Sequence, residues 1–118
     1  MLLAMTKHMN IKQKIIQAGG IKFFIEQDGE EVARAYLYVL KNDLHEVPFG
    51  FLEDVFVDES LRGRGLGTEL LKEVFKMAKI SKCYKIVATS RHERPKVHAL
   101  YERLGFKNRG LEFRMDLR

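Results

Sequence analysis

The stretch Glu53-Asp54-Val55-Phe56-Val57-Asp58-Glu59-Ser60-Leu61-Arg62-Gly63-Arg64-Gly65-Leu66-Gly67-Thr68 decides the architecture of this chain. An apolar run typical of a strand ends at Val57, a polar turn follows, and three alternating glycines lead into an amphipathic pattern. Alternating glycines let the backbone turn tightly and approach a ligand, because no Cβ intervenes. The first turn of a helix has unpaired amides and a partial positive charge. The stretch therefore predicts a phosphate or pyrophosphate site at the start of a helix.

Two common phosphate-binding motifs do not fit this loop. A P-loop needs Gly-x-x-x-x-Gly-Lys-Ser/Thr, and the chain has no such run. The dinucleotide fingerprint needs Gly-x-Gly-x-x-Gly, whereas Gly63-Arg64-Gly65-Leu66-Gly67 lacks the last spacing. A glycine-rich turn that only caps a helix remains the structural alternative at this point.

The hydrophobic pattern on either side of the loop predicts a mixed sheet with flanking helices. Alternating apolar residues indicate strands, Asp28-Gly29 indicates a hairpin turn, and apolar spacings of three and four indicate helices. Pro95 suits the start of a helix and Gly105 suits its end. The predicted strands are residues 21–26, 31–40, 49–57 and 84–90, the helices are 9–17, 65–79 and 95–104, and a last hairpin pairs 106–107 with 111–117. This order indicates an α/β fold.

Two motifs together resemble those of the GNAT acetyltransferases. The first is Arg62-x-x-Gly65-x-Gly67, which is similar to the acetyl-coenzyme A pyrophosphate loop of that family. The second is the run Leu100-Tyr101-Glu102-Arg103-Leu104-Gly105-Phe106, which is similar to the family's Leu-Tyr and Gly-Phe signature. The resemblance covers roughly residues 22–117. It implies a GNAT-like, mostly antiparallel central sheet flanked by helices, with a shortened N-terminal region.

The resemblance implies that acetyl-coenzyme A is the cosubstrate. Backbone groups of the strand before the loop are expected to contact the pantetheine arm, and the amides of the loop to surround the pyrophosphate, with arginines adding positive charge. The residues expected to bind the coenzyme are Phe56, Val57, Arg62, Gly63, Arg64, Gly65, Leu66, Gly67 and Thr68.

Two side chains are candidates for the chemistry of acetyl transfer to an amine. An alkyl ammonium must lose a proton before it attacks, and the departing thiolate must be protonated or stabilised. Glu53 is the expected general base, because the family often has a glutamate at this place on the strand. Tyr101 is the expected general acid, since the tyrosine of the family's motif lies beside the thioester sulfur. The competing interpretations are a solvated carboxylate and a tyrosine packed on a helix face.

The acceptor is expected to be a small-molecule primary amine. The run Leu52-Glu53-Asp54 resembles both polyamine and glucosamine-6-phosphate acetyltransferases. However, Asp116 stands where those sugar-phosphate enzymes have an arginine, and Arg114, two residues earlier, is a candidate to substitute for it. His92 and His98 are left without a role.

The beginning of the chain departs from the usual family pattern. Only about 20 residues precede the first hairpin, where the family has a further strand and two helices that form one wall of the acceptor pocket. A minimal enzyme and a wall supplied by a second subunit both explain this difference. The apolar residues 113–117 could pair across a two-fold axis, so a homodimer is expected.

Length and composition set further limits. We expect one domain over residues 1–118, no membrane span, no signal peptide in the short apolar start, and no metal site. The lone Cys83 cannot form an internal disulfide, which favours a cytoplasmic location. The formal net charge of +5 leaves a nucleic-acid-binding module open as an alternative. A second alternative is a sensor that binds coenzyme A without catalysis.

Overall fold

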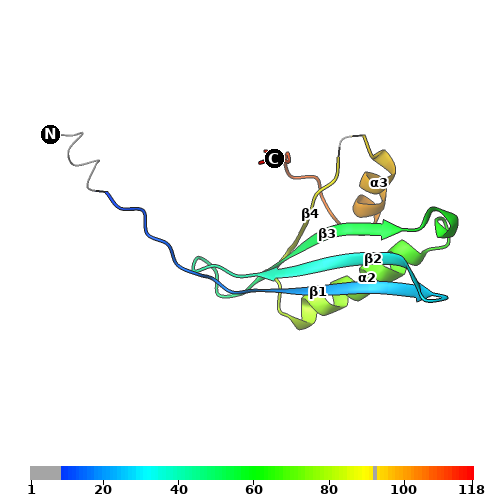
Figure 1. The fold of residues 1–118 in the computed structure, drawn as a ribbon, viewed down its shortest axis with the longest axis horizontal. Coiled ribbons are helices and arrows are strands. Elements are labelled where there is room, and N and C mark those ends of the chain that lie inside the picture. Colours follow the sequence, from blue (N-terminus) through cyan, green and yellow to red (C-terminus); the bar gives the residue numbers. More distant parts are fainter. Residues whose placement is uncertain (1–8, 92) are drawn as a thin grey trace.

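The fold is a four-stranded sheet with two α-helices, seen in a computed structural model that describes residues 9–91 and 93–118. The described elements are β1 (Ala18–Gln27), β2 (Glu30–Leu40), β3 (Phe49–Val57), the 3-10 helix η1 (Glu59–Leu61), α2 (Leu66–Ile80), β4 (Ile86–Ala88) and α3 (Pro95–Arg103). The strand order is β1-β2-β3-β4, with two antiparallel pairs and a parallel β3–β4 pair (Figure 1). The expected mixed, mostly antiparallel sheet with flanking helices is confirmed.

One face of the sheet packs against α2 and forms the core. Alternate residues of β2 are fully buried there, as the strand period of two predicts. They meet an apolar stripe of α2 whose members recur at helical spacing. The buried core cluster consists of Ala33, Ala35, Leu37, Leu52, Leu70, Leu71, Val74 and Ala78. Cys83 packs against this cluster, and burial raises the pKa of its thiol, so it serves as a small apolar residue.

The opposite face of the sheet carries aromatic residues, and we call it the aromatic face. Its aromatic members are Phe24, Tyr36, Tyr38, Phe51 and Phe56. Their side chains share one face because each is paired across strands with another residue of that face. Phe24 is 51% exposed and Tyr38 is 41% exposed, so much of this face is in contact with water.

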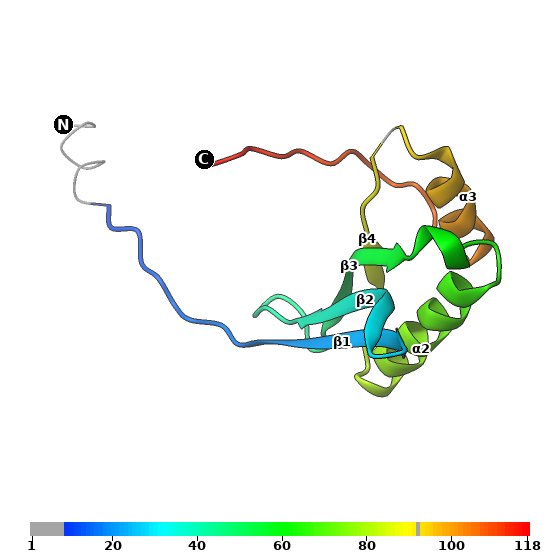
Figure 2. The same cartoon turned by 45° about the vertical axis from the view of Figure 1, so that its right-hand side comes forward.

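Two predicted elements are absent, both near the ends of the chain. Residues 9–17 form no helix but an extended, exposed segment, because a helix of that length has little stability without a surface to pack on. The predicted last hairpin is also wrong: residues 106–118 contain no strand. Both segments run away from the sheet (Figure 2). The predicted strand over 84–90 is shorter, comprising only Ile86–Ala88.

The apolar residues of the C-terminal segment have no packing partner among the described residues. Leu111, Phe113, Met115 and Leu117 are 70%, 90%, 82% and 89% exposed, respectively. They alternate with polar residues, as in a strand with one apolar face. The sequence pattern is therefore that of a strand, but a strand needs a neighbour, and residues 9–91 and 93–110 supply none for this segment.

Candidate active site

The centre of the site is the place where β3 and β4 separate. These parallel strands are paired only from Gly50–Leu52 to Ile86–Ala88. Beyond this point they diverge, and a cleft of about 370 Å³ lies between the second half of β3, the loop after β4, and α3. The cleft is lined by Leu52, Glu53, Asp54, Val55, Thr89, Ser90, Arg91, Arg94, Val97, Leu100, Tyr101, Glu112 and Arg114.

A β-bulge positions Glu53 at this cleft. The pairing register shifts between Arg34 and Tyr36, so that β3 has one residue more than β2. Asp54 takes up the extra residue with a φ of 49°, which non-glycine residues rarely adopt but Asp tolerates better than most. Strict alternation along a regular strand would put Asp54 on the helix side of the sheet, whereas the bulge leaves it exposed.

The environment of Glu53 suits a proton acceptor. Burial raises the pKa of the Glu53 carboxyl above its ordinary value, and the negative charges of Asp54 and Glu112 raise it further. A backbone hydrogen bond from Asp54 works in the opposite direction. A raised carboxyl pKa makes a stronger base, so Glu53 is better suited to take a proton from an amine than a solvated carboxylate.

Tyr101 lies on the other wall of the cleft, on α3. Burial raises the pKa of its phenol, and the charge of Glu53 adds to the shift. Its ring packs against Phe106, with centroids 5.2 Å apart, and Phe106 in turn contacts Phe75 of α2. The Tyr101 carbonyl also accepts a hydrogen bond of 2.9 Å from the Phe106 amide. The structure thus brings both predicted catalytic residues to one cleft and keeps the phenol protonated at neutral pH.

The glycine-rich loop is ordered by its own polar groups. Asp58 caps η1, since its carboxylate accepts hydrogen bonds from the Ser60 amide at 3.1 Å and the Ser60 hydroxyl at 3.0 Å. The Arg62 side chain turns back, and its Nε donates to the Val57 carbonyl at 2.9 Å. This contact fastens the loop to the end of β3. It also occupies a carbonyl that was expected to face the pantetheine arm.

The glycines of the loop have different structural requirements. Gly63 and Gly65 have φ values of 81° and 80°, which only glycine adopts at little cost. Gly65 is the N-cap of α2, so its left-handed conformation turns the chain into the helix. Gly67 has no positive φ, and a Cβ there would meet Val57 Cγ2 at an ordinary 3.7 Å. The fold itself therefore does not require glycine at position 67.

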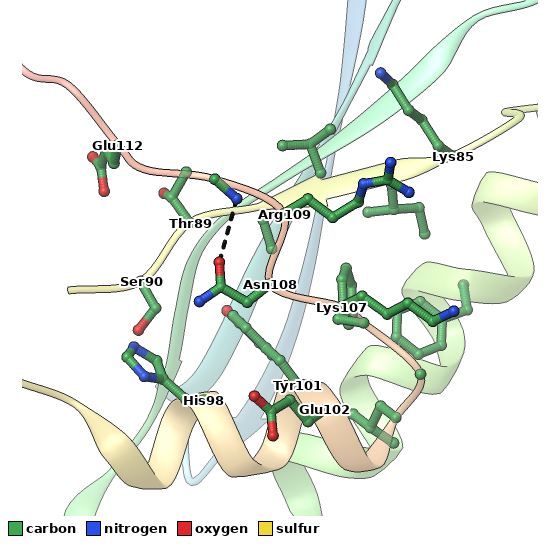
Figure 3. A pocket seen from close by; sticks show the side chains of 18 of the residues that line it. Lys85, Thr89, Ser90, His98, Tyr101, Glu102, Lys107, Asn108, Arg109 and Glu112 are labelled. Atoms are coloured by element: carbon green, nitrogen blue, oxygen red, sulfur yellow. Dashed lines mark hydrogen bonds between the residues drawn. The ribbon is translucent and has the colours of Figure 1, made fainter. Parts of the chain in front are cut away.

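The loop between β4 and α3 is held to the helix by His98. Its Nε2 lies 2.7 Å from the carbonyl oxygen of Arg91, which requires a proton on that nitrogen. Figure 3 shows the His98 ring beside Ser90, on the same side of α3 as Tyr101. The Ser90 hydroxyl is buried and has no hydrogen-bond partner among residues 9–91 and 93–118. The hydrophobic periodicity of the sequence predicted neither the His98–Arg91 hydrogen bond nor the burial of the Ser90 hydroxyl. His92 lies outside the described residues.

A larger groove of about 1330 Å³ adjoins the cleft, between α2, β4, α3 and the segment after α3 (Figure 3). Arg114, considered above as a substitute sugar-phosphate ligand, donates to Asp116 at 2.8 Å. Its charge is therefore already paired. In residues 9–91 and 93–118 no three His, Cys, Asp or Glu side chains cluster as metal ligands would. No helix in these same ranges is long and apolar enough to span a bilayer.

Comparison with known proteins identifies the family of this chain. It is 38% identical over 68 residues to a glucosamine 6-phosphate N-acetyltransferase of Trypanosoma brucei brucei, which covers 58% of this chain and 44% of the relative. It is 32% identical over 115 residues to an aminoglycoside N(6')-acetyltransferase type 1 of Stenotrophomonas maltophilia, covering 91% of this chain and 74% of the relative.

Solved structures show the same fold. An acetyltransferase of Trypanosoma brucei superposes with a TM-score of 0.75 at 31% identity, over 84% of this chain and 70% of the other. The chain spans less than half the length of some of the relatives that it matches. It covers 44% of one glucosamine 6-phosphate N-acetyltransferase and 36% of another. The sequence model of the acetyltransferase (GNAT) family matches residues 5–106, which is most of the chain. The protein therefore belongs to the GNAT acetyltransferase family.

Proposed function

We propose that this protein is an acetyl-coenzyme A-dependent N-acetyltransferase that acts on a small-molecule primary amine. The observation that carries the proposal is the meeting of Glu53 and Tyr101 at the cleft where β3 and β4 separate. The glycine-rich loop follows directly from the end of β3, so a coenzyme with its pyrophosphate at the loop could reach this cleft with its thioester. The named relatives are N-acetyltransferases of amino sugars, which supports an amine acceptor.

The pyrophosphate is held mainly by backbone in this proposal. The Arg62 amide donates to the Glu59 carbonyl at 3.3 Å, so the amides of residues 63–68 are the ones proposed to surround the pyrophosphate, at the start of α2 where the helix dipole favours negative charge. Arg62 and Arg64 are exposed and add positive charge beside the amides. Because the Arg62 Nε is hydrogen-bonded to Val57, its guanidinium is held in place before any ligand arrives. Phe56 and Val57 are proposed to contact the pantetheine arm through their backbone, Val57 through its amide because its carbonyl accepts the Arg62 hydrogen bond.

The chemistry proceeds by direct attack of the amine on the thioester. Glu53 accepts a proton from the ammonium group of the acceptor, either directly or through one water molecule. The neutral nitrogen then forms a bond with the carbonyl carbon of the acetyl group, and the carbon–sulfur bond breaks. The electron pair of that bond leaves with the sulfur, and the Tyr101 hydroxyl donates the proton that yields the free thiol. The nitrogen loses its second proton as the amide forms, which restores the Tyr101 hydroxyl, and Glu53 releases the first proton to solvent. Glu53 thus accepts a proton from the acceptor, and Tyr101 donates a proton to the leaving thiolate.

We also propose that the active form is a cytoplasmic homodimer. The four exposed apolar residues of the C-terminal segment would be buried by pairing with a second copy, which gives the segment the neighbour it lacks. The single cysteine is compatible with a reducing compartment. Light scattering at micromolar protein concentration tests the assembly. A monomer mass together with full activity contradicts it.

Coenzyme binding and turnover are tested separately. Calorimetric titration of coenzyme A is expected to show a single site, and no heat at millimolar ligand would refute the proposal. Release of free thiol is then followed with a set of amines, namely polyamines, amino sugars and their phosphates, amino acids and peptide amines. Coenzyme binding without turnover of any amine would indicate a sensor. Salt-sensitive nucleic-acid binding without coenzyme binding would indicate the other alternative.

A further inference from the structure

The aromatic face meets the catalytic cleft at Glu53. Lys22 of β1, Tyr36 of β2 and Glu53 of β3 are direct partners in the two antiparallel ladders and form one row across the sheet. Direct cross-strand partners have Cβ atoms roughly 5 Å apart. Glu53 is therefore both a wall of the cleft and the end of a row on the aromatic face. A molecule lying on Tyr36 would be adjacent to the candidate base.

Two tyrosines form an ordered pair beside this carboxylate. The rings of Tyr36 and Tyr38 are nearly parallel, at 7°, with centroids 6.4 Å apart. This separation is close to the repeat of roughly 6.6 Å between alternate residues of a strand, so both side chains lean in the same direction. Tyr38 lies against Gly20 of β1, because a Cβ at that glycine would be only 3.1 Å from two ring atoms. Gly20 thus provides the room that this ring occupies.

Lys22 and Arg34 of the aromatic face are both paired with Glu31. Lys22 forms an ion pair with Glu31, and its Nζ is 5.7 Å from the centroid of the Tyr36 ring. Arg34 lies 3.5 Å from Glu31 and has its guanidinium carbon 4.7 Å from the centroid of Phe56. On the side of Glu53 that faces Tyr36, the sheet therefore presents ring surface, whereas the charges of Asp54 and Glu112 lie on the side of the cleft. A ring face can also bind a cation, but Lys22 already occupies that position over Tyr36, so the remaining ring surface is left to an apolar or ring-shaped partner.

We propose that the acceptor amine reaches Glu53 from the aromatic face, and that Tyr36 and Tyr38 bind a ring-bearing body attached to that amine. This inference rests on the proposed function and names the class of acceptor. Tyr101 packs against the helix-side core through Phe106, so it lies on the other side of the sheet from the two tyrosines. The proton acceptor and the proton donor then act from opposite sides of the thioester.

The test compares Tyr36→Leu and Tyr38→Leu with a matched control. Tyr84→Leu removes another exposed tyrosine, 46% exposed, in the loop before β4 and outside the aromatic face. Phenethylamine and glucosamine serve as ring-bearing amines, and 1,4-diaminobutane serves as an open-chain amine. Each variant is compared with wild type on the same amine, so differences in amine pKa cancel.

We expect each of the two leucine variants to raise KM for the ring-bearing amines about tenfold, because a lost ring contact is of that size. In both leucine variants, the KM for acetyl-coenzyme A and the KM for 1,4-diaminobutane should stay within about twofold of wild type, since neither depends on the ring contact. In Tyr84→Leu, the KM for every substrate should stay within about twofold of wild type. Tyr38→Phe should restore the wild-type KM. Unchanged KM values for the ring-bearing amines in both leucine variants would overturn the inference, as would a changed mass in light scattering without a change in KM.

A binding measurement keeps the inference testable if none of the three amines is turned over. In protein saturated with coenzyme A, saturation-transfer NMR should detect phenethylamine or glucosamine on the wild type, with the signal lost in Tyr38→Leu. No signal on the wild type, or an equal signal on both proteins, would contradict it. Absence of coenzyme A binding in calorimetry would instead count against the proposed function itself, so the two failures are distinguishable.

Discussion

Replacement of Gly67 by alanine separates the requirements of the fold from those of the coenzyme. Gly67 is the second residue of α2, has no positive φ, and has room for a Cβ at 3.7 Å from Val57 Cγ2. Alanine is more favourable than glycine in a helix interior by up to about 1 kcal/mol. We therefore expect Gly67→Ala to raise the unfolding free energy by about 0.5 kcal/mol, because part of this gain is lost in the first turn. The corresponding rise in Tm is about 2 °C.

The same methyl group should weaken coenzyme binding. It would stand where a phosphate oxygen approaches the amides at the start of α2, and the loss of one hydrogen bond to a charged group costs about 1.5–3 kcal/mol. This corresponds to an increase in the Kd for coenzyme A of about 10-fold to 100-fold. Calorimetric titration gives the Kd, and thermal unfolding without ligand gives the stability.

Two further variants control this experiment. Lys72 is exposed in the same helix, five residues after Gly67, and Lys72→Ala should leave the Kd for coenzyme A unchanged. Gly65→Ala should instead destabilise the protein by about 1–2 kcal/mol, because its φ of 80° strains any residue with a Cβ. If Gly67→Ala binds coenzyme A as tightly as wild type, the loop does not bind the pyrophosphate through close backbone approach. If it unfolds much more easily than wild type, the structural account of Gly67 is wrong.

Four other perturbations probe the site and the assembly. Glu53→Gln should lower turnover about 10²-fold or more with little change in coenzyme affinity. The pKa of Glu53 is higher in the folded protein than in the unfolded chain. The unfolding free energy of the wild type should therefore fall as the pH rises from the ordinary carboxyl pKa through the raised pKa. Denaturant titrations should show a smaller fall in the variant. Tyr101→Phe keeps the ring but lacks the proton donor, so thiol release should slow about 10²-fold at unchanged Kd, and equal rates would exclude the general-acid role. Glu112→Gln removes a negative charge that raises the pKa of Glu53, so the acid limb of the pH–rate profile should move to lower pH; a shift to higher pH would mean that the limb belongs to another group. Replacing the exposed Phe113 and Met115 by lysine should convert a dimer to a monomer, as measured by light scattering. Replacing the neighbouring polar Glu112 by lysine should leave the dimer intact. A dimer in both variants would place the interface elsewhere.

The local sequence determined most elements of this fold. Alternation in residues 30–40 and the Asp28-Gly29 turn were sufficient for the first hairpin, because strand faces follow from a period of two and the turn needs residues that tolerate a positive φ. The glycine loop and the stripe of α2 were equally readable. Glu53 and Tyr101 were identified by motif although they are 48 positions apart, and the structure brings both to one cleft.

Tertiary structure alone decided the rest, since it depends on contacts between distant residues. The bulge at Asp54 exists because β3 has one residue more than β2 between their paired positions, and no single strand reveals such a difference. The raised pKa of Glu53 depends on burial and on Glu112, which is distant in sequence. At both ends the local pattern predicted elements that are not formed: in the part of the chain that the structure describes, nothing covers residues 9–17 and no strand lies beside residues 111–117. A hydrophobic pattern specifies which face would be buried, but burial itself requires a partner.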